Sequence, residues 1–102
     1  MSAVSPSRSD DTPVLSIVIA VLDERDNLPF VCQELAEALQ HLPKTEVVFV
    51  DDGSRDDTVA VLQKMRAEVL PGLRVLSHDH CCGKSAALRT GITAARGEWI
   101  AT

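Results

Sequence analysis

The sequence predicts an α/β fold in which a parallel sheet is flanked by helices. Short apolar runs rich in β-branched residues alternate with longer amphipathic segments, ending on a fourth apolar run. The connections are short, and this alternation is typical of parallel strands joined by right-handed crossovers. Polar residues gather directly after the first three runs, at the sheet edge where ligands bind in open folds of this kind.

Four segments have the composition of strands. Val14–Leu22 is a nearly continuous apolar and β-branched run, which indicates a strand buried on both faces. The other three are Val47–Val50, introduced by Glu46, then Leu73–Leu76 and Glu98–Thr102. The last one stops without a turn or cap after it. We therefore expect the chain to be the front part of a longer protein.

The first two amphipathic segments carry helix start and stop signals. Asp26 to Pro29 supplies capping side chains and an early proline, and the apolar spacing that follows predicts a helix to about His41. Asp56 and Asp57 precede the second helix, where acids in the first turn would cap it and favour its dipole. Pro71 and Gly72 close that element.

The third helix is expected from Gly83 or Lys84 to Ala95. Its buried stripe would consist of Leu88 and Ile92, and Gly97 stands where a helix-ending glycine is usual. Together the elements make a Rossmann-like sheet with flanking helices.

The composition fits one globular domain after a short leader. Residues 1–12 are almost without apolar side chains and are expected to be a flexible leader, so the domain covers residues 13–102. Ten Lys+Arg against fifteen Asp+Glu give a net charge of −5, which excludes a broad cationic surface for nucleic acid. No run approaches the roughly 18 apolar residues of a membrane helix, and the leader lacks the apolar core of a secretory signal. A cytoplasmic location is therefore expected, while the oligomeric state is not indicated.

Several nucleotide-binding motifs are absent or incomplete. The turn from Ala20 to Asn27 has no glycine, which excludes a dinucleotide fingerprint. Gly83-Lys84-Ser85 would complete a P-loop only if glycine stood at position 78, where the chain has His78. A phospho-receiver domain would carry its acidic cluster after the first strand, but here the aspartate pair follows the second.

Asp51 and Asp52 are the strongest candidate site residues. Two neighbouring carboxylates at the end of a buried strand repel one another and lose hydration, so without a compensating partner they indicate function. Asp56 and Asp57 are interpreted as helix caps, with a ligand role as the alternative. The stretch His78 to Cys82 contains metal-ligand types, but its adjacent cysteines do not suit one tetrahedral ion. Free thiols in a mobile loop are expected there, and a metal site is the alternative.

Four blocks, in this order and spacing, resemble the amino-terminal half of a family 2 glycosyltransferase of the GT-A fold. They read SIVIAVLDE, VFVDDGSRDDT, GKSAALRTG and ARGEWIA, and the resemblance extends from Val14 to Thr102. Within that family the chain is most similar to dolichol- or polyprenyl-phosphate sugar synthases. The resemblance implies that the chain is the nucleotide-binding half of an enzyme that uses a UDP- or GDP-sugar.

The resemblance also implies which residues meet the donor. The nucleotide-binding positions would be Ala20, Leu22, Asp23, Glu24, Asp51, Asp52, Gly83 and Lys84. Three of them depart from the family pattern, because Ala20, Leu22 and Asp23 stand where it has proline, an aromatic residue and asparagine. Base stacking on an aromatic side chain at position 22 is therefore not expected.

The family's Asp-x-Asp motif would follow the fourth strand, beyond Thr102. Catalytic residues and the ligands for Mg²⁺ or Mn²⁺ are accordingly expected outside this chain, with no metal ligand inside it and no activity for the fragment alone. The implied reaction is inverting sugar transfer to polyprenyl or dolichyl phosphate at the cytoplasmic face of a membrane. The alternative is a small non-catalytic α/β binding or regulatory module.

Overall fold

The computed structural model describes residues 12–102, so all but the last residue of the predicted leader lies outside the described residues. Strands and helices alternate along the chain as the sequence predicts. Their bounds are β1 Leu15–Val21, α1 Leu28–Leu39, β2 Thr45–Asp51, α2 Thr58–Glu68, β3 Arg74–Ser77, α3 Lys84–Ala94 and β4 Trp99–Ala101. The strands form one sheet in the order β3-β2-β1-β4, with every pair parallel. The predicted α/β class is confirmed.

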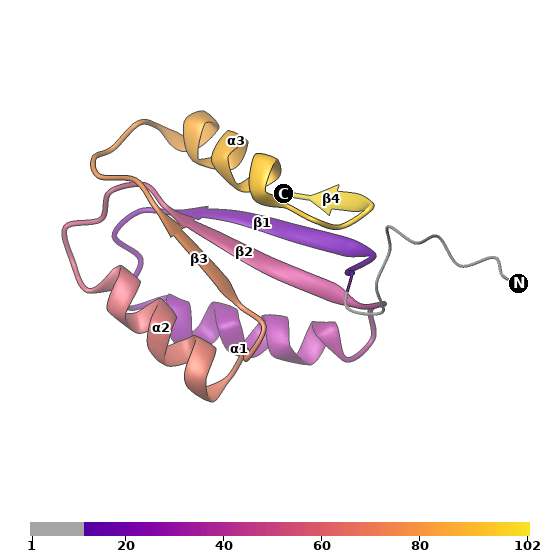
Figure 1. Cartoon of the computed structure of the whole chain (residues 1–102). Helices are drawn as coiled ribbons and strands as arrows, with labels where there is room; N and C mark the ends of the chain where they lie inside the picture. Colours follow the sequence, from indigo (N-terminus) through magenta and orange to yellow (C-terminus); the bar gives the residue numbers. More distant parts are fainter. Residues whose placement is uncertain (1–11) are drawn as a thin grey trace, which may run out of the picture.

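Helices cover both faces of the sheet. In Figure 1, α1 and α2 lie together on one face and α3 lies on the other. Since successive strand residues point to opposite faces, β1 and β2 supply side chains to both layers. The layer under α1 and α2 includes Phe49, Leu28, Leu62 and Leu73. The layer under α3 is smaller and includes Val18, Val48, Val50 and Ala87.

Helix α3 presents only part of the predicted stripe to the sheet, because Leu88 packs against the core beneath the helix but Ile92 is exposed. Leu88 is only half-buried and Ile92 is 42% exposed, whereas Ala87 and Gly91 are buried. A Cβ atom at Gly91 would lie 2.3 Å from the Cγ1 atom of Val18. The helix packs so closely that only small residues fit at the contact, and the larger apolar side chains are displaced to its flanks.

Gly97 also has a role other than the expected one. Helix α3 ends at Ala94, the next residue, Ala95, is extended (ψ 141°), and Gly97 is not in the left-handed region. Instead its N–H donates to the Ser16 hydroxyl at 2.8 Å, and a Cβ atom there would lie 2.7 Å from the Ser16 nitrogen. The glycine permits close approach to β1.

The predicted caps of α1 and α2 are present only in part. Neither Asn27 nor Asp57 makes a side-chain capping hydrogen bond, and neither helix has an acid in its first turn. The Asn27 amide donates to the Glu24 carboxylate instead. Asp56, which lies before α2, accepts the N–H of Thr58 at 2.8 Å. Asp56 therefore serves the first N–H group of α2, whereas a local partner takes the side chain of Asn27.

A buried polar network joins the strands at the end of the sheet where β2 begins. Glu46 is 5% exposed, and its carboxylate accepts the Ser16 hydroxyl at 2.5 Å, the Arg74 guanidinium at 3.0 Å and the Arg96 N–H at 2.6 Å. Arg74 also donates to the carbonyl oxygen of Ala94. Burial alone would raise the pKa of Glu46, but these donors outweigh it and lower the pKa to about 2. The network ties β1, β2, β3 and the segment after α3 together.

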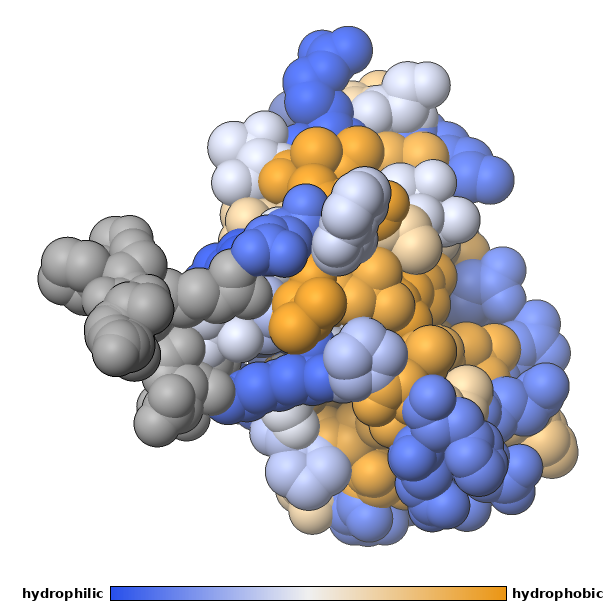
Figure 2. Space-filling model, turned by 90° about the vertical axis from the view of Figure 1, so that its right-hand side faces the viewer, coloured by the Kyte–Doolittle hydropathy of each residue, from blue (hydrophilic) through white to orange (hydrophobic). Residues whose placement is uncertain are grey.

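Part of the molecular surface is apolar. Figure 2 shows a broad band of hydrophobic side chains bordered by hydrophilic ones on the face seen from the right of Figure 1. All three residues of β4 are exposed, with Trp99 at 68%. Over residues 12–102, none of the helices combines the length and apolar character needed to cross a membrane.

Candidate functional site

A pocket of about 410 Å³ lies where β1 and β2 end and α3 begins. Pockets of this volume commonly hold small molecules. Its lining consists of Ala20, Val21, Leu22, Glu24, Asp52, Cys81, Gly83 and Lys84. The structure therefore brings together all the predicted site residues except Asp23 and Asp51.

The pocket lies beside an unpaired stretch of β1. Strand β4 pairs only with residues from Leu15 to Ile17, so on that side the carboxyl half of β1 has no strand partner among residues 12–102. Two smaller pockets, of about 170 and 270 Å³, also share Ala20 in their lining. The small side chain at this position leaves the space above the strand open.

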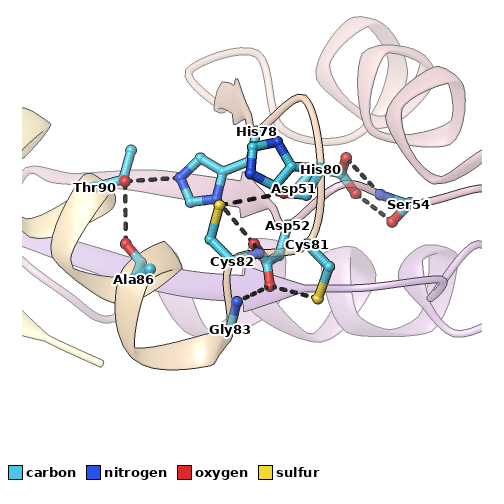
Figure 3. Close-up of polar contacts among 10 residues, drawn as sticks. All are labelled: Asp51, Asp52, Ser54, His78, His80, Cys81, Cys82, Gly83, Ala86 and Thr90. Carbon is cyan, nitrogen blue, oxygen red and sulfur yellow. Dashed lines mark hydrogen bonds and ion pairs between the residues drawn. The ribbon is translucent and has the colours of Figure 1, made fainter.

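The Asp52 carboxylate is buried beneath the loop that connects β3 to α3. Its Oδ1 atom accepts the Cys82 N–H at 2.9 Å and lies 2.9 Å from Nδ1 of His78. Its Oδ2 atom accepts the Gly83 N–H at 2.9 Å and the Cys81 thiol at 3.3 Å. Figure 3 shows these contacts converging on one carboxylate. The Cys82 amide foremost, and then His78, hold the pKa of Asp52 well below its usual range.

Asp51 has separate partners, because consecutive residues at the end of β2 fall on opposite faces of the sheet. Its carboxylate accepts the Ser54 N–H at 3.1 Å and also the Ser54 hydroxyl. The two aspartates thus each have the compensating donors that the sequence could not show. A carboxylate has room for about four hydrogen bonds, and those of Asp52 are filled within the chain. Its predicted contact with the base or ribose stays a prediction.

Asp23 connects two of the loops at this edge. It is in the left-handed region (φ 51°), which aspartate tolerates better than most residues. Its Oδ1 atom accepts the N–H of Arg55 at 2.8 Å, and its own N–H donates to the Ser54 hydroxyl at 2.8 Å. Next to it, the Glu24 N–H donates to the Thr58 hydroxyl at 2.9 Å. Asp23 and Asp51 shape the loops, and their predicted roles toward a ligand remain predictions.

Two glycines allow the loops to meet. Gly53 has φ 81°, and a Cβ atom there would lie 2.6 Å from the carbonyl carbon of His80. Gly83 has φ 100° and directly precedes α3, which begins at the exposed Lys84.

A cation at a helix amino terminus, such as Lys84, is unfavourable unless an anion is close. The pocket therefore combines carboxylates with a lysine beside a helix start.

Comparison with known proteins identifies the family. The model of glycosyl transferase family 2 matches residues 16–102. The chain belongs to glycosyl transferase family 2. The predicted family is confirmed, and the matched residues cover the whole sheet except Leu15, the first residue of β1.

Two curated relatives illustrate the similarity. Dodecaprenyl-phosphate galacturonate synthase of Rhizobium johnstonii is 32% identical over 99% of this chain and 31% of its own length. Undecaprenyl-phosphate 4-deoxy-4-formamido-L-arabinose transferase of Pseudomonas savastanoi is 34% identical over 86% of this chain and 26% of its own length. The chain thus spans between a quarter and a third of the length of these family 2 relatives.

Two solved structures share the fold. The mannosyltransferase PcManGT of Pyrobaculum calidifontis, in complex with GDP-Man and Mn²⁺, superposes with a TM-score of 0.73 at 24% identity. It is covered over 26% of its chain, against 86% of this one. TarS of S. aureus gives a TM-score of 0.68 over 84% of this chain and 25% of its own. Both comparisons support the GT-A architecture predicted for this family 2 chain.

One cluster in the family 2 chain contains metal-ligand types. Within residues 12–102, ligand atoms of Asp52, His78 and Cys82 lie within 4.8 Å of one another. These atoms already have partners, since the Cys82 thiol donates to the carbonyl oxygen of His80 and the carboxylate accepts four donors. Mg²⁺ and Mn²⁺ also prefer oxygen ligands to sulfur. The cluster does not fit the divalent cation of a glycosyltransferase.

Sequence reasoning missed the residues that contact the two aspartates, directly or through His78, without lining the pocket. The sequence indicates for His78 only a polar loop or, as the alternative, a metal ligand, and it assigns no role to Ser54 or Thr90. His78 had one usable signal in the sequence, its place directly after the third predicted strand. In the structure its N–H donates to the carbonyl oxygen of Asp51. Thr90 had none, since a threonine inside a helix is ordinary. No disulfide joins the cysteines of residues 12–102, and Cys32 is buried while Cys81 and Cys82 are exposed.

Proposed function

We propose that the pocket binds the nucleoside diphosphate portion of a UDP- or GDP-sugar and serves as the donor site of a glycosyltransferase. The observation that carries the proposal is the gathering of Ala20, Leu22, Glu24, Asp52, Gly83 and Lys84 around one pocket at the carboxyl ends of the strands. These are six positions that the family resemblance assigns to the donor.

The chemistry of the lining suits the two ends of such a ligand. A base imide and ribose hydroxyls donate hydrogen bonds, and the half-buried Glu24 carboxylate is an acceptor on the pocket wall. A diphosphate is anionic, and Lys84 with the first N–H groups of α3 supplies positive potential. The base would therefore lie toward Glu24 and the phosphates toward Lys84.

The relatives suggest the acceptor. Two of them are named for dodecaprenyl phosphate and undecaprenyl phosphate, and we carry the polyprenyl phosphate class to this chain. An acceptor phosphate oxygen would attack the sugar carbon and displace the nucleoside diphosphate with inversion. Because this oxygen is already anionic, it needs little help from a general base. The reaction would take place at the cytoplasmic face of a membrane.

A divalent cation belongs to this proposal. The structure of PcManGT contains Mn²⁺ together with GDP-Man, and Mn²⁺ or Mg²⁺ would neutralise the diphosphate of the leaving group. The described part of this chain offers no fitting oxygen-rich set of ligands. Within this proposal, residues of this chain bind the base and ribose and hold the diphosphate at the start of α3.

Calorimetric titration of the chain with UDP, GDP and their sugars, with and without Mn²⁺, tests the proposal. One nucleoside diphosphate is expected to bind, and Glu24→Gln is expected to weaken it about tenfold or more, because a charged hydrogen bond is lost. Glu34→Gln is the matched control, since Glu34 is an exposed residue of α1 outside the pocket lining. Equal affinities in the two variants, or no binding by the wild type, would contradict the proposal.

A further inference from the structure

A chain of polar contacts runs from helix α3 to the carboxylate under the pocket. The imidazole of His78 has Nδ1 at 2.9 Å from Oδ1 of Asp52 and Nε2 at 2.8 Å from the Thr90 hydroxyl. The Thr90 hydroxyl also lies 3.1 Å from the carbonyl oxygen of Ala86, one helical turn earlier. Figure 3 shows the imidazole between the helix and the carboxylate.

The direction of the first contact follows from its chemistry. An ionised carboxylate only accepts hydrogen bonds, so Nδ1 of His78 must carry the hydrogen that points to Asp52. The His78 side chain is 15% exposed and that of Asp52 is 5% exposed. Both ring nitrogens have partners, and the ring therefore has one preferred orientation.

The same carboxylate fixes the pocket wall. Its two oxygens accept the N–H groups of Cys82 and Gly83, which directly precede Lys84. Cys81, Gly83 and Lys84 all line the pocket, whereas neither His78 nor Thr90 does. The position of the wall therefore depends on a carboxylate that is itself held from α3.

We propose that His78 is a positioning residue, anchored by Thr90, which orients the Asp52 carboxylate so that the segment from Cys81 to Lys84 is held ready for a nucleoside diphosphate. This inference rests on the proposed function of the pocket. His78 acts through Asp52 and does not itself touch the ligand. Its role is to keep the wall in place before binding, which lowers the cost of ordering the wall on binding.

The first test changes the anchor and leaves the imidazole intact. Thr90→Val removes the hydroxyl at nearly constant volume, and calorimetry with UDP and GDP is expected to show affinity lowered roughly two- to tenfold, the range for one hydrogen bond. Thr90→Ser retains the hydroxyl and is the matched control, with affinity expected within about twofold of wild type. Wild-type affinity in a folded Thr90→Val variant would overturn the positioning role.

A second test compares replacements of the imidazole itself. His78→Asn keeps an amide donor near the place of Nδ1, whereas His78→Leu leaves the buried carboxylate without that donor. The leucine variant is expected to lose about tenfold or more in affinity, with the asparagine variant in between. Equal losses in both variants would show that the donor to Asp52 is not what matters.

Thiol reactivity gives a readout that needs no nucleotide. Cys81 and Cys82 are exposed and Cys32 is buried, so Ellman's reagent reports on the loop. Thr90→Val is expected to react roughly two- to tenfold faster than wild type, and Thr90→Ser at the wild-type rate. Faster reaction with unchanged nucleotide affinity would reduce the contact to a structural one. If the wild type binds neither nucleotide, the proposed function fails. Thiol rates that are the same in wild type and Thr90→Val would independently overturn the positioning of the loop by Thr90 and His78.

Discussion

The buried Glu46 carboxylate makes the stability of the fold depend on pH in a way that one substitution can isolate. Its pKa is about 2 in the folded chain, against an ordinary value of 4.5, because Ser16, Arg96 and Arg74 outweigh the effect of burial. Such a difference corresponds to about 3 kcal/mol of folding free energy. Since the folded-state pKa is lowered, this contribution is complete above pH 4.5 and is lost as the pH falls toward 2.

The assay is urea unfolding followed by circular dichroism at about pH 7 and about pH 2.5. Glu46→Gln is expected to be less stable than wild type by about 3 kcal/mol at the higher pH, and this difference should shrink markedly at the lower one. Taking the difference between the two proteins removes the contributions of other carboxyl groups. Glu34→Gln, at an exposed position of α1, controls for replacing a glutamate at neutral pH. A difference that stays the same at both pH values would refute the reasoning.

Two further substitutions test the packing of α3 and the phosphate end of the pocket. Gly91→Ala should lower the free energy of unfolding by about 1 to 3 kcal/mol, because its Cβ atom would lie 2.3 Å from Val18. Gly72→Ala, which meets nothing within 4 Å, should be nearly neutral in the same unfolding experiment, and equal effects would contradict the packing. Lys84→Ala should weaken a nucleoside diphosphate by roughly 1 to 3 kcal/mol in calorimetry while the nucleoside binds as before. Equal losses for both ligands would indicate a folding defect instead of a phosphate contact.

The sequence predicted the fold because the order of elements follows from the hydrophobic pattern of each segment along the chain. Alternating buried runs and amphipathic segments determine a parallel sheet, and this prediction is confirmed. The face of α3 could not be obtained in the same way. Apolar spacing favours Leu88 and Ile92, but the close approach of backbone to sheet selects Ala87 and Gly91. That choice depends on the distance between two elements, which a periodicity does not contain.

The location of the candidate site was predictable, and its internal contacts were not. The rule that ligands bind at the carboxyl ends of parallel strands placed Glu24, Asp52 and Lys84 near one another, and they line one pocket. The donors to Asp52 include the backbone N–H groups of Cys82 and Gly83, which every residue type except proline could supply. Only the path of the loop shows that they converge on one carboxylate.

The proposed ligand of the pocket formed by the carboxyl ends of β1 and β2 and the start of α3 is a nucleoside diphosphate. Titration of the ¹⁵N-labelled chain with UDP and GDP, followed by NMR, tests it residue by residue. Amide signals from Ala20 to Glu24 and from Cys81 to Lys84 are expected to shift with saturation. Signals near Glu46, at the opposite end of β2, should stay in place. No saturable shifts, or shifts centred on Glu46, would contradict the account.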